Sequence, residues 1–441
     1  MSVIGDLATF VGEASALHLP QRDRDQLRRH VGDAALAGIA GARTSEAAHL
    51  RALDPNAKGF EAIAIAAAII RHTEVDDIHL GSCTTPSSVT VPVALMLAQA
   101  AGVTDTDRIA SAIWAGTDLI VRLGVAINGP TVLYRGIWPT AIGAPLGAAA
   151  VAARIWGLDH AQTENALSLA LMMTAGRTGR FQGALSGRWV LFIGAVAEGL
   201  RAAHAARLGF CGDASLLDGP WFAKAQGIEA DMSELTKGLG ETSVFPLLSM
   251  KPFCTARQAL GATEAMIGLL DEGLDPHSIE SVKVRAPQAY AGMISGAIDP
   301  ASRSTGFVNA GFQMGLAAFS RAHLWDLDRV NVMNNPEVLA FARKVSVEPD
   351  AELQKQFPKR WPAEIEVRAG GRTLHRAAHE VTGDPDKPLD DAALALKAHR
   401  ILDPLFGMNN AARMISIAHG GLNDAAACQK LCAAFGAVMQ S

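Results

Sequence analysis

Residues 140–156, with the sequence TAIGAPLGAAAVAARIW, contain a single charged side chain, Arg154, among small and aliphatic residues. A segment without a polar face is typical of a helix that is buried on all sides. It is shorter than the roughly 20 apolar residues that a helix needs to cross a bilayer. The segment therefore predicts the interior helix of a large, tightly packed helical core.

The sequence on both sides of this segment has the apolar spacing of amphipathic helices. The predicted helices occupy residues 1–53 (as two helices), 60–72, 91–101, a stretch beginning at 105, 161–174 and 190–208. Gly209 follows the last of them, as is common at the C-terminal end of a helix. Residues 1–245 are thus expected to form one helical block.

The pattern changes near Phe245. Alternation with a period of two, which is typical of strands, appears at 279–285 (IESVKVR), 345–347 (VSV) and 363–368 (AEIEVR). The AGGR sequence at 369–372 predicts a hairpin turn into a further strand at 373–379, and helices are expected at 257–270 and 310–319. After Pro388, helical spacing returns at 390–400, 409–419 and 423–435.

These patterns predict a mainly α protein with two domains. A large all-helical domain is expected to contain residues 1–245 and to be completed by residues 400–441, which pack back on the first block. Residues 246–399 are expected to form a smaller α+β domain.

The composition excludes several classes of protein. Of 441 residues, 49% are hydrophobic and 19% are charged, which excludes intrinsic disorder. The net charge of −5, with no long basic run, argues against nucleic-acid binding. No apolar stretch is long enough for a membrane span, and the first fifteen residues lack the basic start of a signal peptide. With five scattered cysteines, an odd number that indicates reduced thiols, we expect a cytoplasmic protein.

Motifs for common cofactors are missing from the sequence. It contains neither of the phosphate-binding patterns GxGxxG and GxxxxGK[ST], nor HExxH, nor GxSxG. We therefore expect no cofactor and no metal site. Cofactor-free acid–base chemistry and plain binding are the remaining possibilities.

The first polar cluster is Glu74-Val-Asp-Asp77-Ile-His79, followed by a hydroxyl-rich loop, Ser82-Cys-Thr-Thr-Pro-Ser-Ser88, that opens a helix. Hydroxyl groups and backbone amides at the N-terminus of a helix suit a carboxylate ligand. The alternative interpretation is a helix N-cap accompanied by solvated acidic side chains.

A second cluster, Tyr134-Arg-Gly-Ile-Trp-Pro-Thr140, directly precedes the apolar helix. Arg135 could bind a carboxylate through its fork of N–H groups. The segment could equally be a helix-entry loop, with Pro139 in the first turn.

Basic side chains mark two further stretches. Arg177, Arg180 and Arg188 lie in a glycine-rich segment between two apolar helices, where their partner is either a protein acid or an anionic ligand. Lys251, in Met250-Lys-Pro-Phe-Cys-Thr-Ala256, is a lone lysine in an apolar run at the domain change. It could act as a base, or it could be a surface lysine whose stem covers apolar side chains.

Taken together, these segments resemble the MmgE/PrpD family along nearly the whole chain. DDIH at 76–79 is similar to the family's DDTH, GTDLIVRLG at 116–124 to GYEVxxRLG, RGIWPT at 135–140 to RGFHPT, and GDPDKPL at 383–389 to GDPxNPL. KPF at 251–253 stands in the place of KPY. The resemblance implies a large all-helical domain joined to a smaller α+β domain, with the active-site cleft between them. It also implies cofactor-independent dehydration, decarboxylation or epimerisation of small polycarboxylates.

The chain also departs from the family pattern. Thr85 stands where the family has the histidine of HPG, Trp138 replaces the histidine of RGFHPT, and Arg188 replaces a lysine. Dehydration needs both a base and an acid, so ordinary 2-methylcitrate dehydratase activity is not expected. The family residues that the chain keeps are Lys251, Asp77 and Arg135.

The resemblance and these departures together imply an isomerase, an epimerase or a lyase that moves a proton next to a carboxylate of a small (poly)carboxylate substrate. The acid–base candidates are Lys251, Asp77, His79 and Tyr134. The expected substrate contacts are Thr84, Thr85, Arg135, Trp138, Arg177, Arg180 and Arg188. The indole of Trp138 could also admit a ring-containing substrate. The alternative function is that of a catalytically dead homologue that serves as a binding or scaffold protein, and in either case we expect a homodimer.

Overall fold

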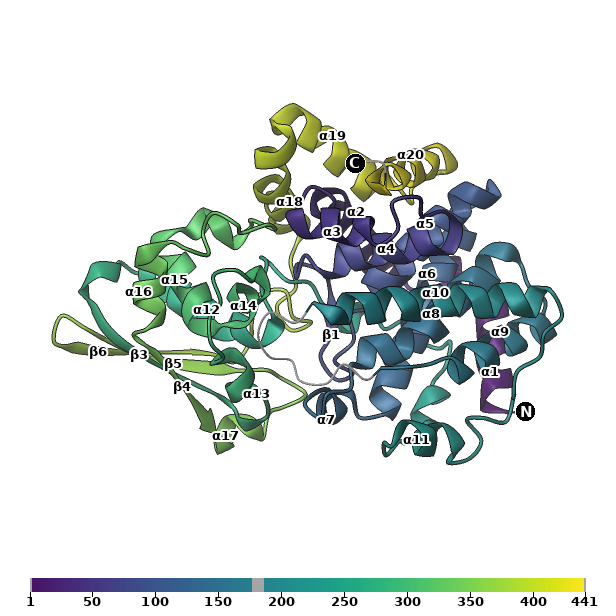
Figure 1. Ribbon diagram of the computed structural model, residues 1–441, viewed down its shortest axis with the longest axis horizontal. Helices are drawn as coiled ribbons and strands as arrows, with labels where there is room; N and C mark the ends of the chain where they lie inside the picture. The colour runs from purple at the N-terminus through teal and green to yellow at the C-terminus, as the bar shows by residue number, and fades with distance from the viewer. Residues whose placement is uncertain (1, 177–185, 440–441) are drawn as a thin grey trace. The chain divides into compact units, whose positions relative to one another are not determined.

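The computed structural model describes residues 2–176 and 186–439 (Figure 1). It is 61% helical, with strands confined to small sheets, so the predicted mainly α fold class with a smaller α+β part is confirmed. The chain divides into two compact units. Unit 1 comprises residues 2–176, 187–248 and 402–439, and unit 2 comprises residue 186 and residues 249–401. The domain boundaries drawn from the sequence stay a prediction.

Unit 1 is built almost entirely from helices (Figure 1). Its elements before residue 248 are α1 (Val3–Glu13), α2 (Gln21–Gly41), α3 (Ser45–Ala52), α4 (Gly59–Arg71), β1 (Ile78–His79), α5 (Ser87–Ala101), α6 (Thr106–Ala126), α7 (Gly129–Leu133), α8 (Pro139–Trp156), α9 (His160–Met172), α10 (Gly187–Arg207) and α11 (Trp221–Gln226). The C-terminal residues add α19 (Met408–Gly420) and α20 (Ala425–Gly436), which pack on α2 and α5 respectively.

Helix α8 is the interior helix predicted from residues 140–156, and all of its residues except Arg154 and Trp156 are buried. Glycine allows α6 to approach it closely, because a Cβ atom at Gly147 would lie 2.3 Å from the Ile120 side chain. The guanidinium of Arg154 donates to the carbonyls of Gly12 and Ala14 at 2.8 and 2.7 Å. The one charged side chain of the segment therefore supplies hydrogen-bond donors to carbonyl groups at the C-terminal end of α1.

One helix among the described residues, α6, is long and apolar enough to cross a membrane. Within it, 83% of the apolar window is buried inside the protein. Burial of this kind is typical of the core helix of a globular protein.

Two helices differ from the sequence-based expectation. The first 53 residues form three α-helices instead of two, because Thr44 accepts a hydrogen bond from the Ala47 amide and caps α3. Helix α5 begins at Ser87, earlier than the predicted residue 91, and it continues through Pro92. Part of the hydroxyl-rich loop thus belongs to the first turn of α5.

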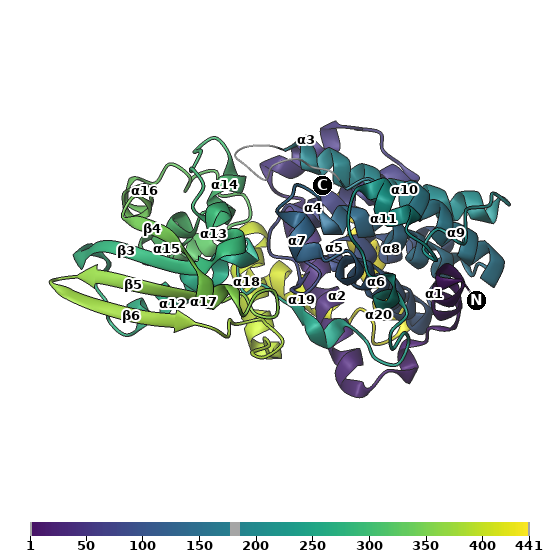
Figure 2. The same ribbon diagram turned by 90° about the horizontal axis from the view of Figure 1, so that it is seen from below.

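Unit 2 contains a four-stranded sheet in the order β4-β3-β5-β6 (Figure 2). Its strands are β3 (Ile279–Pro287), β4 (Val345–Asp350), β5 (Ala363–Ala369) and β6 (Arg372–Ala378), with a short strand β2 (Leu248–Ser249) preceding them in the chain. Strand β3 pairs with β4 in parallel and with β5 antiparallel, and β5 pairs antiparallel with β6. The hairpin predicted at 369–372 is present, with Gly370 and Gly371 at positive φ.

Helices in unit 2 pack against this sheet and against one another. They are α12 (Arg257–Asp271), α13 (Gln288–Ile294), α14 (Arg303–Val308), α15 (Ala310–Phe319), α16 (Pro336–Ala342) and α17 (Ala351–Gln354). Helix α12 contacts β5 and β6, and β5 alternates buried residues such as Ile365 and Val367 with more exposed ones. Helix α18 (Asp391–Phe406) then carries the chain back to unit 1.

Candidate active site

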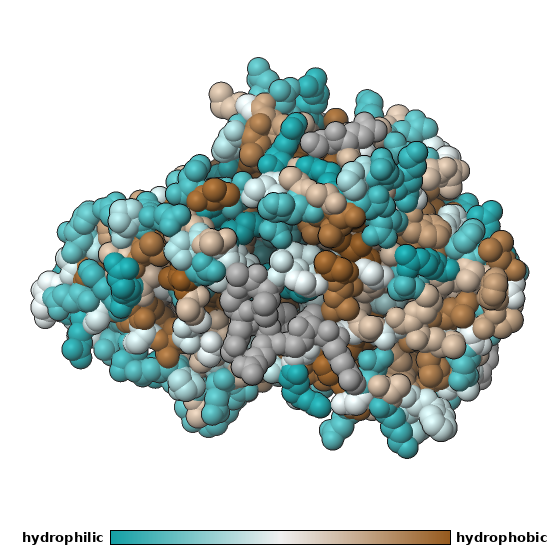
Figure 3. Space-filling model, in the orientation of Figure 1, coloured by the Kyte–Doolittle hydropathy of each residue, from teal (hydrophilic) through white to brown (hydrophobic). Residues whose placement is uncertain are grey.

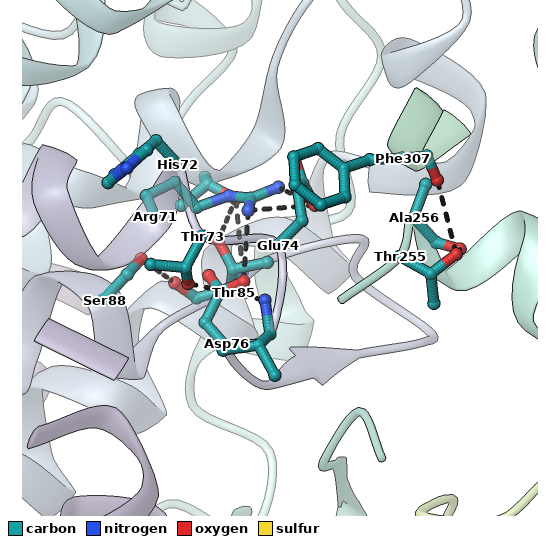
Figure 4. Close-up of polar contacts among 12 residues, drawn as sticks. Arg71, His72, Thr73, Glu74, Asp76, Thr85, Ser88, Thr255, Ala256 and Phe307 are labelled. Atoms are coloured by element: carbon teal, nitrogen blue, oxygen red, sulfur yellow. Dashed lines mark hydrogen bonds and ion pairs between the residues drawn. The ribbon is translucent and has the colours of Figure 1, made fainter. Parts of the chain in front are cut away.

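The segment between α4 and α5 holds a buried ionic cluster. Arg71 is the last residue of α4, and its Nη1 lies 3.1 Å from Asp76 Oδ1 and 3.2 Å from Glu74 Oε2 (Figure 4). Burial opposes the charge of Arg71, but Asp76 and Glu74 outweigh it and raise the pKa of the guanidinium. Arg71 is therefore charged, and it holds the first half of the loop in one conformation.

Asp77 is also buried, and protein groups surround its carboxylate. The Ser87 amide donates to Oδ1 at 3.2 Å, the Ser87 hydroxyl donates to Oδ2, and His30 Nδ1 lies 3.0 Å from Oδ2. The carboxylate thus neutralises the positive N-terminal end of α5. His30, on α2, is buried as well, and its Nε2 makes no hydrogen bond to another described residue.

His79 lies on β1 and bonds to residues of the tight turn that follows it. Its Nδ1 accepts a hydrogen bond from the Ser82 amide at 3.1 Å and lies 3.0 Å from the Ser82 hydroxyl. The His79 amide donates to the Thr84 carbonyl at 2.8 Å. Burial lowers the pKa of His79 to about 4, although the charge of Asp77 acts in the opposite direction. The imidazole is therefore neutral at pH 7.

The hydroxyl groups of the loop bind mainly to one another and to α8. Thr84 Oγ1 lies 2.7 Å from Ser82 Oγ, and Thr85 donates its amide to Thr140 Oγ1 at 3.1 Å. Ser88 donates to the Thr85 carbonyl at 2.7 Å (Figure 4). These contacts join the start of α5 to the first turn of α8.

The second predicted cluster is split by the fold. Tyr134 directly follows α7 and is half-buried, whereas Arg135 is exposed and donates to the Gly227 carbonyl at 3.3 Å. Trp138 is buried and directly precedes α8, where Pro139 is the first helical residue, as the helix-entry interpretation had it. Trp138 reaches the ionic cluster, since the Arg71 guanidinium lies 5.8 Å from the centre of its ring.

Aromatic side chains extend from Trp138 toward α10. Trp138 stacks on Phe192, with ring centres 5.3 Å apart, and meets Trp189 edge to face at 6.1 Å. Arg188 lies over the ring of its neighbour Trp189 at 4.3 Å. A chain of side chains thus connects Arg71, Trp138 and Arg188 within unit 1. Arg177 and Arg180 lie outside the described residues.

Lys251 belongs to unit 2 and is only 2% exposed, so it is not the surface lysine that one interpretation of the sequence allowed. The backbone beside it is held by the GDPDKPL segment. The Met250 amide donates to the Gly383 carbonyl at 2.9 Å, and Gly383 has a φ of +94°. A Cβ atom at Gly383 would lie 1.9 Å from the Met250 carbonyl oxygen, so only glycine fits there.

Asp384 forms a buried ion pair next to Ser249, two residues before Lys251 in the chain. It accepts hydrogen bonds from Ser249 Oγ at 2.8 Å and from Arg257 Nε at 3.0 Å, and its second oxygen binds Arg257 Nη2. Arg257 is the first residue of α12. This pair fixes the strand that leads into Lys251 against α12.

Several of these residues were missed by the sequence analysis. Arg71, His30, Arg257 and Asp384 were not singled out, although a charged residue at the end of an apolar helix, such as Arg71, is a usable signal for a buried ion pair. Within residues 2–176 and 186–439, no group of three His, Cys, Asp or Glu side chains could hold a metal ion.

Comparison with protein families gives two matches. The MmgE/PrpD N-terminal domain matches residues 58–233, and the MmgE/PrpD C-terminal domain matches residues 253–423. The first match contains the ionic cluster, His79 and Trp138, whereas Lys251 lies in the short interval between the two. Comparison with curated proteins gives no match.

Proposed function

Because the chain belongs to the MmgE/PrpD family, we propose that it is a cofactor-independent isomerase, epimerase or lyase acting on a small (poly)carboxylate. The family includes dehydratases, lyases and epimerases, which supports an enzyme role. The reaction that we propose is proton transfer at a carbon next to a carboxylate. The observation that carries the proposal is the match of both family domains to one chain.

The chemistry requires a base for the C–H proton and donors for the negative charge that develops on the carboxylate oxygens. We propose Lys251 as the base, because it is an amine in a buried setting with a rigid backbone around it. Tyr134 and His79 are the other groups proposed to act on the substrate. For Asp77 we propose a positioning role, since three protein donors already use its carboxylate.

The substrate contacts proposed here come from the aromatic and basic side chains. Trp138 and Arg188 belong to one connected group in unit 1. The remaining proposed contacts are Thr84, Thr85, Arg135, Arg177 and Arg180.

The loss of two family histidines limits the possible reactions. The groups at their positions are the Thr85 hydroxyl, which is bonded to Thr140, and the indole of Trp138, which packs among aromatic rings. Neither can supply a proton near pH 7. We therefore propose epimerisation, isomerisation or decarboxylation, which need fewer proton-transfer groups than dehydration.

A panel experiment tests the proposed function. Purified protein is incubated with di- and tricarboxylates such as malate, citrate and tricarballylate, and products are followed by proton NMR. Conversion of at least one compound, lost in Lys251→Ala, is the expected result. A protein that binds panel members in calorimetry but converts none of them would support the scaffold alternative instead.

A homodimer and a cytoplasmic location are also part of the proposal. Apolar side chains gather on the surface of unit 1 (Figure 3), and Leu208, Phe210 and Trp221 are 66%, 63% and 66% exposed. Such residues in unit 1 favour an isologous contact with a second copy. Light scattering at micromolar concentration would show twice the chain mass if this is correct, and the chain mass if it is not.

A further inference from the structure

The hydrogen bonds around His79 determine which of its ring nitrogens carries the proton. A backbone amide can only donate, so the Ser82 amide at 3.1 Å requires a lone pair on Nδ1. The proton of the neutral ring must then lie on Nε2. His79 Nε2 makes no hydrogen bond to another described residue, and the side chain is partly exposed.

The turn that carries Ser82 leaves little room for a different arrangement. The Ser82 hydroxyl is 2.7 Å from Thr84 Oγ1, and the His79 amide donates to the Thr84 carbonyl. The chain also packs tightly against the start of α7, since a Cβ atom at Gly129 would lie 1.8 Å from the Ser82 carbonyl oxygen. The orientation of the imidazole is therefore fixed before any ligand binds.

We infer that His79 is a neutral hydrogen-bond donor that binds a carboxylate oxygen of the substrate through Nε2–H and that it transfers no proton during the reaction. This inference rests on the proposed function. The low pKa of the ring supports it, because an imidazole that stays neutral above pH 5 keeps its donor and gains no charge. Asp77 is the charged group whose field acts on the ring.

The donor has a defined part in the reaction. When the base removes the proton from the carbon next to the carboxylate, the C–H bond breaks and its electron pair forms a C=C bond to the carboxylate carbon. Negative charge then grows on the two carboxylate oxygens. A fixed N–H donor at one of these oxygens stabilises the charged transition state more than it stabilises the substrate, so it lowers the activation barrier. The proton stays on Nε2 throughout.

Nitrogen-15 NMR of the full-length protein tests the charge and the tautomer. The His79 signals, assigned with the His79→Gln variant, should show a protonated Nε2 and an unprotonated Nδ1 at every pH from about 5 to 8. A titration with a midpoint near 6.5, or a proton on Nδ1, would overturn the inference. This measurement needs no substrate.

Two variants test the donor role against any panel compound that the wild type converts. Glutamine places an amide donor near the position of Nε2, whereas the asparagine side chain is one carbon shorter and does not reach it. We expect His79→Gln to stay within about tenfold of the wild-type kcat and His79→Asn to lose on the order of 10²-fold. Equal rates in the two variants would refute the donor role. A wild type that converts no compound would refute the proposed function, and with it the donor role, while the NMR result would still decide the tautomer.

Discussion

The substitution Asp384→Asn is expected to cause a large loss of stability in unit 2. The carboxylate of Asp384 accepts hydrogen bonds from Arg257 Nε and Nη2 and from Ser249, and Arg257 is almost completely buried. Asparagine has nearly the same shape, so the change removes the charge and leaves the volume. The guanidinium of Arg257 would then be a buried charge whose counterion is missing.

The magnitude follows from this burial. Removing one partner of a buried ion pair typically costs about 3–5 kcal/mol, because the other charge is left uncompensated. Unit 2 contains the residues from Ser249 to Ile401. For a unit of that size, about 3–5 kcal/mol corresponds to a decrease of roughly 6–20 °C in melting temperature. We also expect turnover to fall, because the strand that leads into Lys251 loses its attachment to α12.

Thermal and urea unfolding of the purified full chain measures this loss. The matched control is Ser249→Ala, which removes only the neutral hydrogen bond to Asp384 and should cost about 0.5–1.5 kcal/mol. The double substitution Arg257→Met with Asp384→Leu removes both charges and should regain most of the lost stability. If Asp384→Asn unfolds within about 1 kcal/mol of the wild type, the ion pair does not hold unit 2 together and this reasoning is wrong.

Three further outcomes are expected. The substitution Gly129→Ala should lower the free energy of unfolding in urea by about 3 kcal/mol, because its Cβ would lie 1.8 Å from the Ser82 carbonyl oxygen. The control Gly12→Ala, whose Cβ would have no atom within 4 Å, should not destabilise the protein, and equal effects of the two substitutions would contradict the packing argument. If Lys251 is the base, Lys251→Ala and Lys251→Arg should both lose on the order of 10²-fold in kcat on a converted panel compound, and activity restored by arginine would instead assign Lys251 to carboxylate binding. Because burial lowers the pKa of His79 from 6.5 to about 4, the folded protein binds fewer protons than the unfolded chain in that range. The contribution of His79 to the free energy of unfolding is therefore complete above pH 6.5 and decreases toward pH 4. Between pH 7 and 4.5 the wild type should lose on the order of 2 kcal/mol more of this free energy than His79→Gln. Equal losses in the two proteins would refute the lowered pKa of His79.

Much of the fold could be predicted because its signals are local. The run at 140–156, with Arg154 as its single charge, predicted the interior helix, and period-two alternation at 279–285 and 363–368 predicted paired strands. Helix α3 was not separated from α2 because it is short and half of its eight residues are polar, and its N-cap, Thr44, was the available signal. The early start of α5 depends on Asp77, ten residues away, which a pattern search does not connect with Ser87.

The candidate site was less predictable, since its contacts join distant parts of the chain. Asp77 was singled out, but its contact with His30 spans 47 residues and could not be foreseen from spacing. The pair of Arg257 and Asp384 is separated by 127 residues. Residue type alone also did not distinguish Trp138, which joins the buried cluster, from Arg135, which is exposed.

Hydrogen exchange at the carbon next to a carboxylate tests the central claim most directly. The protein is incubated in D₂O with each panel carboxylate, and the molecular mass of the recovered compound is measured by mass spectrometry. We predict that at least one compound gains a deuterium atom at this carbon with the wild type and gains none with Lys251→Ala. Deuterium uptake that is absent from every compound, or equal in wild type and variant, would contradict proton transfer by this site.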